Sequence, residues 1–310
     1  MTITCVGGDI RQLYLAKILL NNHYQVQMVG FSKNDWDTAF PVSHSDKKTP
    51  KPQFFTSQQL TDAFAKSEII LGPIPLSKDG KTISCTNASD TILLSQLLNS
   101  LKSSHYFIGG LISNSIKDIL QKNNITYYDY LSNASFARLN AIATAEGAIS
   151  YAIEHSPGNL HQSNVLILGY GTCGSILAKK CQGLNANVTV AGRRPETKAL
   201  AISHGHQYLD IATLEQCHEL SSFQYIFSTI PALVLTKEIL QKISLDCTIV
   251  DIASAPGSAD YNFLQKRPIN ATLYLGIPGK IAPKASAQIL FDIIINRLQE
   301  RSRIYVAQSL

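Results

Sequence analysis

The residues with the clearest chemical meaning form a glycine-rich turn in the middle of the chain. The apolar run Val165–Leu168 ends in Gly169, Gly171 and Gly174, with the spacing G-x-G-x-x-G, and a helix is predicted from Ser175 to Leu184. A buried strand, a tight turn and a helix N-terminus in this order direct backbone amides at a pyrophosphate. Glycine-rich turns also serve purely structural ends, but a second strand predicted beyond the helix favours a dinucleotide site. The expected cofactor contacts in this turn are Gly169, Tyr170, Gly171, Thr172, Cys173 and Gly174.

Two arginines stand where the choice between NAD and NADP is usually made. An NAD-binding protein places Asp or Glu after the second strand of this fold, to bind the ribose 2′-hydroxyl. Here the strand predicted over 187–192 is followed by Arg193 and Arg194. Guanidinium groups pair well with a 2′-phosphate through charge-assisted hydrogen bonds. The sequence therefore favours NADP(H) over NAD(H), although a solvated basic turn would show the same pattern.

Further segments follow the carboxyl ends of predicted strands, where open α/β sheets bind ligands. Thr229, Ile230 and Pro231 follow the fourth strand of this half and are expected along the nicotinamide-ribose side of the cofactor. Ala253 follows the next strand and is a further expected cofactor contact. Each segment is also compatible with an ordinary turn.

The elements that must position these residues alternate between strand and helix. In the first half, strands are predicted at 3–6, 25–29, 53–55, 68–72, 105–109 and 125–130, and helices at 10–21, 58–66, 90–101 and 115–122. In the second half, strands are predicted at 165–168, 188–191, 208–209, 225–229, 248–252 and 272–275. Residues 31–52 and 76–89 read as loops. This alternation predicts an α/β protein with two doubly wound parallel-sheet domains, the second a Rossmann NAD(P)-binding domain.

Two long helices are expected to join these domains across a cleft. The predicted organisation is a flavodoxin-like substrate domain over 1–134, a linking helix and hinge over 135–158, a Rossmann domain over 159–284, and a C-terminal helix over 285–310 that packs back on the first domain. The apolar residues at 289–298 make that last helix a buried one. In the linking helix, Leu139, Ile142, Ile149 and Ile153 predict one apolar face, which would include Glu146. A carboxylate on such a face needs a partner: either a structural hydrogen bond or a place at the edge of the cleft.

Composition narrows the class of protein. The chain has 310 residues, of which 45% are hydrophobic and 16% charged, so it can bury a sizeable core. The net charge of +5 is modest and the basic residues are scattered, apart from Lys47–Lys48 and Arg193–Arg194, so nucleic-acid binding is not indicated. The six cysteines include no C-x-x-C pair and no zinc spacing, which predicts reduced thiols and no metal site. The N-terminus opens directly into a strand, so neither secretion nor a membrane span is expected. We therefore expect a cytoplasmic protein.

The first strand–helix turn of the chain differs from the glycine-rich turn. Gly7, Gly8 and Asp9 lie where a phosphate loop would lie, but the three-glycine spacing is missing and the Asp9 carboxylate would repel phosphate. The first half therefore resembles a nucleotide fold whose turn serves something else.

Several of these motifs together resemble one family, the A subunit of dipicolinate synthase, a sporulation enzyme with a pyridine-nucleotide dehydrogenase-like plan. The resembling segments are Gly7-Gly8-Asp9 with Arg11-Gln12, Ala145-Glu146-Gly147, Leu168–Gly174, Thr229-Ile230-Pro231, Asp251–Ser254, Pro256-Gly257, Pro278-Gly279, Ala282-Pro283-Lys284 and Gln288-Ile289-Leu290. The phosphate loop is generic, whereas the opening Gly-Gly-Asp-x-Arg-Gln and the closing Pro-Gly and Ala-Pro-Lys segments are more specific. One position departs from the family pattern: Ala255 stands where that pattern has Arg between Ser and Pro.

The resemblance implies a two-domain NADP(H)-dependent enzyme that acts with a flavoprotein-like B subunit of dipicolinate synthase. It would oxidise dihydrodipicolinate, a cyclic dicarboxylate, to dipicolinate at a CH–CH or CH–N bond, in the mother cell of a sporulating bacterium. A homo-oligomer is also expected. If the family arginine holds a substrate carboxylate, Ala255 puts that mode of binding in question.

The oxidation requires a protein that holds two carboxylates and accepts a proton. Arg11 and Lys284 come from matched motifs and are the candidates for carboxylate binding, with Gly8 beside them. Asp9 is the candidate base or orienting group, and Glu146 is the second choice. The structural alternatives are a helix N-cap for Asp9, a surface helix charge for Arg11 and a favourable charge near a turn for Lys284.

Two other functions remain compatible with the sequence. A two-domain 2-hydroxy acid or amino acid dehydrogenase would have the same plan, but His204, His206 and His218 surround the third strand and are not expected to reach the nicotinamide. A non-catalytic NADPH-binding regulatory protein would also keep the glycine-rich turn, because cofactor binding does not fix chemistry.

Overall fold

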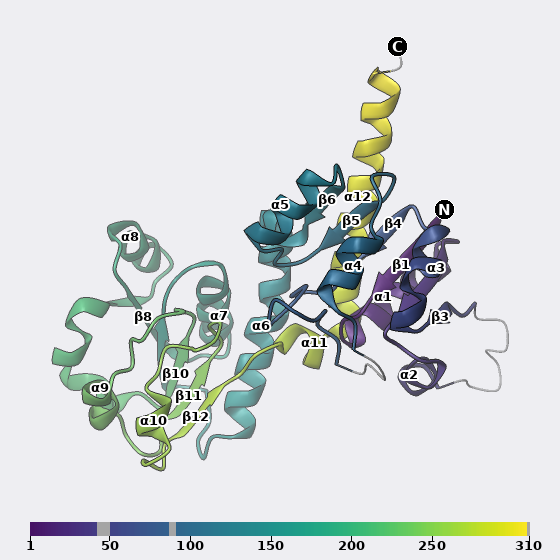
Figure 1. The fold of residues 1–310 in the computed structure, drawn as a ribbon. Helices are drawn as coiled ribbons and strands as arrows, with labels where there is room; N and C mark the ends of the chain where they lie inside the picture. The colour runs from purple at the N-terminus through teal and green to yellow at the C-terminus, as the bar shows by residue number, and fades with distance from the viewer. Residues whose placement is uncertain (42–49, 87–90, 309–310) are drawn as a thin grey trace. The chain divides into compact units, whose positions relative to one another are not determined.

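The chain folds into two compact units. The computed structural model describes residues 1–41, 50–86 and 91–308 (Figure 1), so the basic pair Lys47–Lys48 lies outside the described residues. Unit 1 comprises residues 1–137 and 282–310, and unit 2 comprises residues 138–281. The domain bounds expected from the sequence stay a prediction.

Unit 1 is built on a parallel six-stranded sheet in the order β3-β2-β1-β4-β5-β6. Its strands are β1 (Thr2–Val6), β2 (Gln25–Val29), β3 (Gln53–Phe55), β4 (Ile69–Leu71), β5 (Tyr106–Gly109) and β6 (Thr126–Asp129). Its helices are α1 (Ile10–Asn21), α2 (Lys33–Ala39), η1 (Ser57–Gln59), α3 (Leu60–Ala65), α4 (Leu94–Ser100), α5 (Asn114–Lys122), η2 (Tyr130–Ser132) and α12 (Pro283–Gln308). Long α6 (Ala134–Glu154) begins in unit 1 and continues into unit 2.

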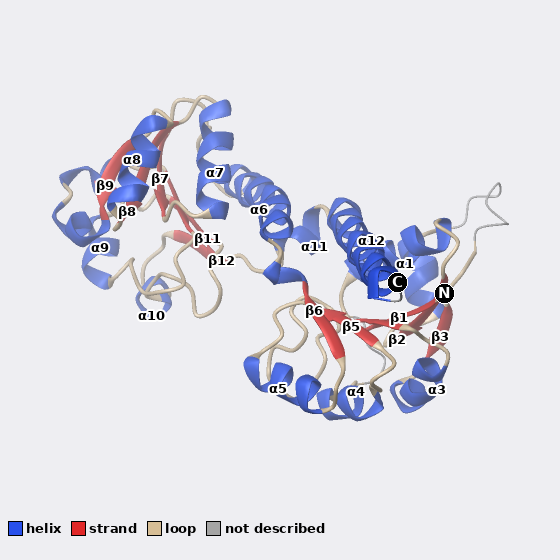
Figure 2. Cartoon of the chain, turned by 90° about the horizontal axis from the view of Figure 1, so that it is seen from above, coloured by secondary structure: helices blue, strands red, loops and turns tan. Residues whose placement is uncertain are grey.

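Helices cover both faces of the unit 1 sheet because its strand residues alternate between two cores. Ile3 and Cys5 of β1 pack with α1 and α12, whereas Val6 packs with α3, α4 and α5 on the other side. Figure 2 shows α1 and α12 above this sheet and α3, α4 and α5 below it. In α12, the residues buried against α1 are Ala287, Leu290, Ile293 and Ile294.

One segment of unit 1 contradicts the sequence reading. The sequence predicts a loop over residues 31–52, but Lys33–Ala39 is helix α2. The Ser32 hydroxyl accepts a hydrogen bond from the Asp35 amide, and the Asp35 carboxylate accepts one from the Ser32 amide. This capping box starts the helix, and Trp36 anchors it in the core with 3% of its surface exposed. The polar composition of the segment conceals both features.

Unit 2 repeats the same strand order, β12-β11-β10-β7-β8-β9, again all parallel. Its strands are β7 (Asn164–Leu168), β8 (Asn187–Gly192), β9 (Gln207–Asp210), β10 (Tyr225–Ser228), β11 (Thr248–Asp251) and β12 (Asn270–Leu273). Its shorter helices are α7 (Thr172–Gly183), α8 (Pro195–Ser203), η3 (Ile211–Gln216), η4 (His218–Ser222), α9 (Lys237–Lys242), α10 (Tyr261–Leu264) and α11 (Ile277–Ile281). The predicted α/β class with two doubly wound sheets is confirmed.

Both sheets have one point where the strand order reverses. In unit 1 this switch point lies between β1 and β4, and in unit 2 it lies between β7 and β10. Ligands of open α/β sheets bind outside the carboxyl ends of the strands at such a point, because the connections diverge there. Each unit therefore offers one favoured position for a ligand.

The apolar face predicted for the linking helix is wrong. Leu139, Ile142 and Ile153 are exposed by 45%, 39% and 48%. The buried side of α6 in unit 2 carries small residues instead, Ala145, Ala148 and Ala152, together with Ile149. Alanine methyl groups allow a close approach of helix to sheet, and they carry little weight in a pattern based on large apolar residues.

No helix in the described part of the chain is long and apolar enough to cross a membrane. Nor do the described side chains include three His, Cys, Asp or Glu residues grouped as metal ligands.

Candidate active site

The glycine-rich turn follows β7 at the switch point of unit 2. Gly169 has φ +90°, a conformation that favours glycine, and its amide donates to the Ala191 carbonyl oxygen at 2.9 Å. A Cβ on Gly169 would lie 2.5 Å from Thr229 Oγ1, and a Cβ on Gly174 would collide with the Gly169 carbonyl oxygen. These two glycines are therefore required by the fold of the turn itself.

Gly171 is glycine for a different reason. Its φ of −82° suits any residue, and a Cβ placed on it would meet no atom within 4 Å. In the described chain, the amides of Gly171, Thr172 and Cys173 at the start of α7 donate to no protein acceptor. Open space in front of free amides at a helix N-terminus is the arrangement that binds a phosphate group. The residues present thus fit the pyrophosphate of a dinucleotide.

The structure brings the expected nicotinamide-side residues next to this turn. Leu168 at the end of β7 pairs in register with Ser228 at the end of β10. The Thr229 amide and hydroxyl both donate to the Leu168 carbonyl oxygen, at 2.9 Å and 3.1 Å. Ile230 is half-buried beside them and Pro231 is exposed. Thr229, Ile230 and Gly169 therefore form one surface at the switch point.

Arg193 and Arg194 lie at the carboxyl end of β8. Both side chains are exposed, and neither forms an ion pair within the described residues. Arg194 is the N-cap residue of α8, which starts with Pro195. Gly192 before them is confined by Thr197, whose Cγ2 would lie 2.7 Å from an added Cβ. The two guanidinium groups are thus available to meet an anion.

Ala253 belongs to a loop that a buried carboxylate organises. Asp251 at the end of β11 is fully buried and accepts hydrogen bonds from the Ala253 amide at 3.0 Å, the Ser258 hydroxyl at 2.9 Å and the Tyr261 hydroxyl at 3.1 Å. Ala253 is 4% exposed, whereas Ala255 is exposed on the same loop. The role of Ala253 as a cofactor contact stays a prediction.

Sequence reasoning missed an aromatic group behind the glycine-rich turn. The Tyr170 hydroxyl lies 2.8 Å from His204 Nδ1, and the His206 ring meets the Tyr170 ring edge-on at 5.8 Å. Burial lowers the pKa of His206, and the nearby His204 lowers it further. Burial also raises the pKa of the Tyr170 hydroxyl. Histidine spacing after α8 hinted at such a group, but only the fold places both rings against the turn.

In unit 1, the turn after β1 holds a compact ion pair. Asp9 is the N-cap residue of α1 and accepts a hydrogen bond from the Arg11 amide at 3.0 Å. Arg11 Nε and Nη2 donate to the two Asp9 carboxylate oxygens at 2.8 Å and 2.7 Å, and Nη2 also donates to the Ile74 carbonyl oxygen at 2.9 Å. The side chains are exposed by 12% for Arg11 and 25% for Asp9. Asp9 thus caps helix α1, as its structural alternative predicted. The structural alternative for Arg11, a surface helix charge, is wrong, because its side chain is largely buried.

The same turn is closed by a neighbouring segment of chain. The Gly8 amide donates to the Ser84 carbonyl oxygen at 2.7 Å, and the Thr86 amide donates to the Gly8 carbonyl oxygen at 2.9 Å. The amide that would bind phosphate is therefore already used, and the start of α1 is capped by a carboxylate. This turn does not fit a dinucleotide.

A small cavity nevertheless lies at this switch point. Its volume is about 10 Å³, and its walls come from the ends of β1 and β4, the start of α1 and one residue of α12. The lining residues are Gly8, Asp9, Arg11, Gln12, Gly72, Pro73, Ile74 and Leu290. The structure thus gathers three of the four predicted substrate-binding residues around one cavity.

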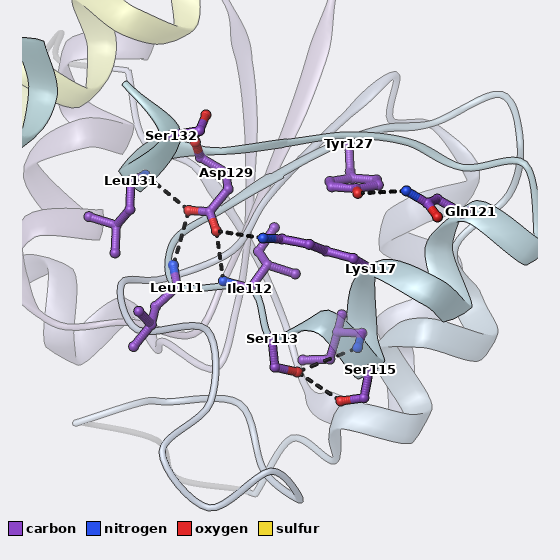
Figure 3. A network of polar contacts seen from close by, with 11 residues as sticks. Leu111, Ile112, Ser113, Ser115, Lys117, Gln121, Tyr127, Asp129, Leu131 and Ser132 are labelled. Atoms are coloured by element: carbon purple, nitrogen blue, oxygen red, sulfur yellow. Dashed lines mark hydrogen bonds and ion pairs between the residues drawn. The ribbon is translucent and has the colours of Figure 1, made fainter. Parts of the chain in front are cut away.

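A carboxylate at the end of β6 organises the loop that follows β5 (Figure 3). Asp129 at the end of β6 accepts hydrogen bonds from the Leu111 amide at 3.1 Å and the Ile112 amide at 2.9 Å. The adjacent Gly110 amide donates to the Pro73 carbonyl oxygen at 3.1 Å. Because Pro73 precedes the Ile74 carbonyl that receives Arg11, Asp129 supports the position of Arg11 through the loop after β5.

Two predicted catalytic residues are not among the groups that form the turn and cavity of unit 1. Lys284 is exposed in the first turn of α12 and is not among the residues that line the cavity. Glu146 is 53% exposed and pairs with Lys180 Nζ of α7 at 2.7 Å. The expectation of a costly carboxylate on a buried stripe is wrong for Glu146, because more than half of its side chain is exposed to solvent. The catalytic roles of Lys284 and Glu146 stay predictions.

Comparison with known proteins tests the family resemblance that the sequence motifs predict. Residues 2–131 match the family described as the N-terminal domain of the dipicolinate synthase A subunit. The A subunit of dipicolinate synthase from Bacillus subtilis (strain 168) is 27% identical over 301 residues, which cover 97% of this chain and 96% of that protein. This chain resembles the dipicolinate synthase A subunit along almost its whole length. The resemblance predicted from the motifs is confirmed.

Solved structures agree with this result. The crystal structure of the dipicolinate synthase A subunit from Bacillus halodurans matches with a TM-score of 0.80 at 27% identity, over 96% of this chain and 97% of that one. An L-alanine dehydrogenase matches with a TM-score of 0.57 at 14% identity, over 94% of this chain and 87% of that one. The second likeness concerns the fold alone: both chains share the two-sheet plan.

Proposed function

We propose that this chain is the dehydrogenase-like A subunit of a dipicolinate synthase. It would bind NADP(H) and oxidise dihydrodipicolinate to dipicolinate, with transfer of a hydride to NADP⁺ and release of a proton. The observation that carries the proposal is the open glycine-rich turn at the switch point of unit 2, in a chain that resembles the A subunit over 97% of its length. The two-sheet plan shared with an L-alanine dehydrogenase is consistent with this proposal as far as the fold is concerned.

The cofactor assignment rests on three groups of unit 2. The free amides at the start of α7 would hold the pyrophosphate, and Arg193 with Arg194 would hold the 2′-phosphate of NADP(H) rather than the bare ribose of NAD(H). Thr229, Ile230 and Pro231 would line the nicotinamide-ribose side. When bound, the nicotinamide accepts the hydride, and the protein contributes binding and orientation.

The substrate assignment rests on unit 1. Arg11 would bind a ring carboxylate, with Gly8 leaving space beside it, and Lys284 would supply a second positive charge from α12. Asp9 would orient Arg11, because both of its carboxylate oxygens are engaged by that guanidinium. Ala255, which replaces a family arginine, gives the substrate one fewer guanidinium partner and increases the importance of Arg11.

The test is a spectrophotometric assay of the purified chain with NADP⁺ and dihydrodipicolinate. We expect the absorbance of NADPH to rise, and to rise faster when a flavoprotein-like B subunit is added. A parallel assay with NAD⁺ should show a weaker response. A panel of 2-hydroxy acids and amino acids separates the proposed reaction from that of an ordinary two-domain dehydrogenase. Binding of NADPH with no absorbance change for any substrate would instead identify a non-catalytic regulatory protein.

The assembly and location follow the same proposal. The relative's name designates one lettered component of a synthase, which fits a heteromeric enzyme in which the B subunit is the partner. We propose that the complex works in the cytoplasm of the mother cell of a sporulating bacterium. Size-exclusion chromatography of the chain alone and with the B subunit tests both the homo-oligomer and the mixed complex.

A further inference from the structure

One buried polar side chain at the switch point of unit 1 has no hydrogen-bond partner among the described residues. Gln12 in the first turn of α1 is only 4% exposed, and no residue that the structure describes forms a hydrogen bond with its Nε2. No hydrogen bond to its Oε1 is formed by the described residues either. A buried amide without a partner lowers stability, since water is removed and nothing replaces it. Such a group at a ligand-binding position suggests a partner that arrives from solution.

The place of Gln12 matches the place of the cavity. Gln12 and Arg11 both line the space of about 10 Å³ at the ends of β1 and β4. That volume admits about one water molecule or one oxygen atom of a carboxylate, but not a ring. A Cβ on Gly8 would collide with Gln12 Cγ, so the glycine at that position gives the glutamine side chain its room. The cavity is therefore suited to the end of a ligand whose body lies outside.

The donors around the cavity select the chemistry of that ligand. Arg11 uses Nε and Nη2 for Asp9 and Ile74, which leaves its Nη1 without a partner among the described residues. The Asp9 carboxylate is engaged by Arg11, so its charge is balanced within the pair. Arg11 and Gln12 both line this small space, and each has a donor group left without a partner by the described residues. A carboxylate oxygen is the acceptor that gains most from a charged donor.

We propose that Gln12 is a substrate-binding residue whose Nε2 donates to one carboxylate oxygen of the ring dicarboxylate, beside the Arg11 guanidinium. This inference rests on the proposed function and adds a specificity-determining residue to it. A dicarboxylate would then fill the cavity while its other carboxylate binds elsewhere, whereas a monocarboxylate of the same ring can form only one of these two contacts.

The experiment measures ligand affinity and thermal stability on the full chain loaded with NADPH. Dipicolinate and picolinate, its monocarboxylate counterpart, are titrated by calorimetry into the wild type and Gln12→Leu. We expect dipicolinate affinity to fall by about 10–100-fold in Gln12→Leu, with picolinate affected less. The melting temperature should rise by about 2–4 °C, because an unpartnered amide is replaced by an apolar group of similar size. Gln12→Met serves as a second variant if the branched leucine packs poorly.

Gln27 provides a matched control in the same unit. It is also buried, with 5% of its surface exposed, but its Oε1 accepts hydrogen bonds from Thr4 Oγ1 at 3.0 Å and Ser67 Oγ at 3.3 Å. Gln27→Leu should lower the melting temperature and leave dipicolinate affinity unchanged. A higher melting temperature in Gln12→Leu and a lower one in Gln27→Leu would show that Gln12 serves ligand binding, whereas Gln27 stabilises the fold.

The possible failures are distinct. If the wild type binds dipicolinate and both Gln12 variants bind it equally well, the inference is overturned and the cavity holds a bound water only. If the wild type binds no dipicolinate and turns over no dihydrodipicolinate, the proposed function fails, and the inference fails with it. A drop in melting temperature in both Gln12 variants would also contradict it, because the amide would then be stabilising the fold.

Discussion

The two switch points of this protein share one strand order but differ in the turn that follows the first strand of each sheet. In unit 2 the turn after β7 leaves the start of α7 open, with free amides and room in front of Gly171. In unit 1 the turn after β1 is closed, because Ser84 accepts from the Gly8 amide and Asp9 caps α1. The turn after β7 offers backbone dipoles to an anion, whereas the turn after β1 offers the side chains of Arg11 and Gln12 around a small cavity.

Under the proposed function, this difference lets one architecture bind two classes of ligand. A pyrophosphate binds several backbone amides at once, and side chains must not block its approach to them. The spacing of the glycines therefore determines that site. A small carboxylate needs one or two well-placed donors, so the site tolerates a capped helix and a blocked turn. The supporting loops are alike in kind, because a carboxylate organises each: Asp251 the loop after β11 in unit 2, and Asp129 the loop after β5 in unit 1.

The largest effect is expected from filling the open turn. Gly171→Val should weaken NADPH binding by about 100-fold or more, because the side chain would occupy the space of the phosphate, while the melting temperature stays unchanged. Gly174→Val is the contrasting variant: its Cβ collides with the Gly169 carbonyl oxygen, so both binding and stability should fall. Calorimetric titration and thermal melts check both. Equal destabilisation by the two variants would contradict a ligand-related role for Gly171.

The next effect concerns the choice of cofactor in unit 2. Replacing Arg193 and Arg194 together by Ala should raise the KM for NADP(H) by about 10–100-fold, since each guanidinium loses a charge-assisted hydrogen bond to the 2′-phosphate. The KM for NAD(H) should change by less than about 2-fold. Steady-state kinetics with both cofactors test this. A similar rise for both cofactors would rule out the 2′-phosphate assignment.

A smaller effect is expected at the closed turn of unit 1. Asp9→Asn keeps an N-cap residue for α1 but removes the ion pair that fixes Arg11. Dipicolinate affinity should fall by about 3–10-fold, with kcat nearly unchanged, because Asp9 orients a binding group. Calorimetric titration and single-turnover kinetics at saturating substrate provide the two measurements. A loss of kcat of about 100-fold or more would show instead that Asp9 accepts the proton.

The smallest effect is a pH dependence that distinguishes the units. Burial lowers the pKa of His206 behind the glycine-rich turn and of His105 in the core of unit 1. A lowered pKa means that the unfolded chain binds more protons, so stability is complete above about pH 6.5 and is lost as the pH falls through the folded-state pKa. NADPH affinity should decline over the same range, because protonated His206 disturbs Tyr170.

Variants of the two histidines check this prediction. His206→Phe should flatten the pH profile of NADPH affinity below about pH 6.5. His105→Asn should leave that profile as it is, since His105 bonds the Phe64 carbonyl oxygen and the Lys102 amide away from the cofactor site. An unchanged profile in His206→Phe would show that the histidine is a packing residue alone.

Much of the fold could be predicted from the sequence because parallel strands are continuous apolar runs between helices. The bounds of β2, β3 and α1 agree with the prediction residue for residue. The short polar helix α2 escapes prediction, since a capping box and one buried Trp36 leave little periodicity. The buried face of α6 is misplaced, because alanines pack there while larger apolar residues are exposed. Patterns of large apolar residues do not register packing by methyl groups.

Local sequence was enough to specify the glycine-rich turn, the arginines after β8 and the residue types at the end of β1, because each depends on chain neighbours only. Which of these groups meet was settled by the fold. It brought Thr229 to Leu168 across 61 residues and Arg11 to Ile74 across 63, and it closed the turn after β1 with Ser84. It also left Gln12 buried with no partner for its Nε2 among the described residues. Such contacts arise from the order of strands in a sheet, and that order is set by packing over the whole unit rather than by local spacing.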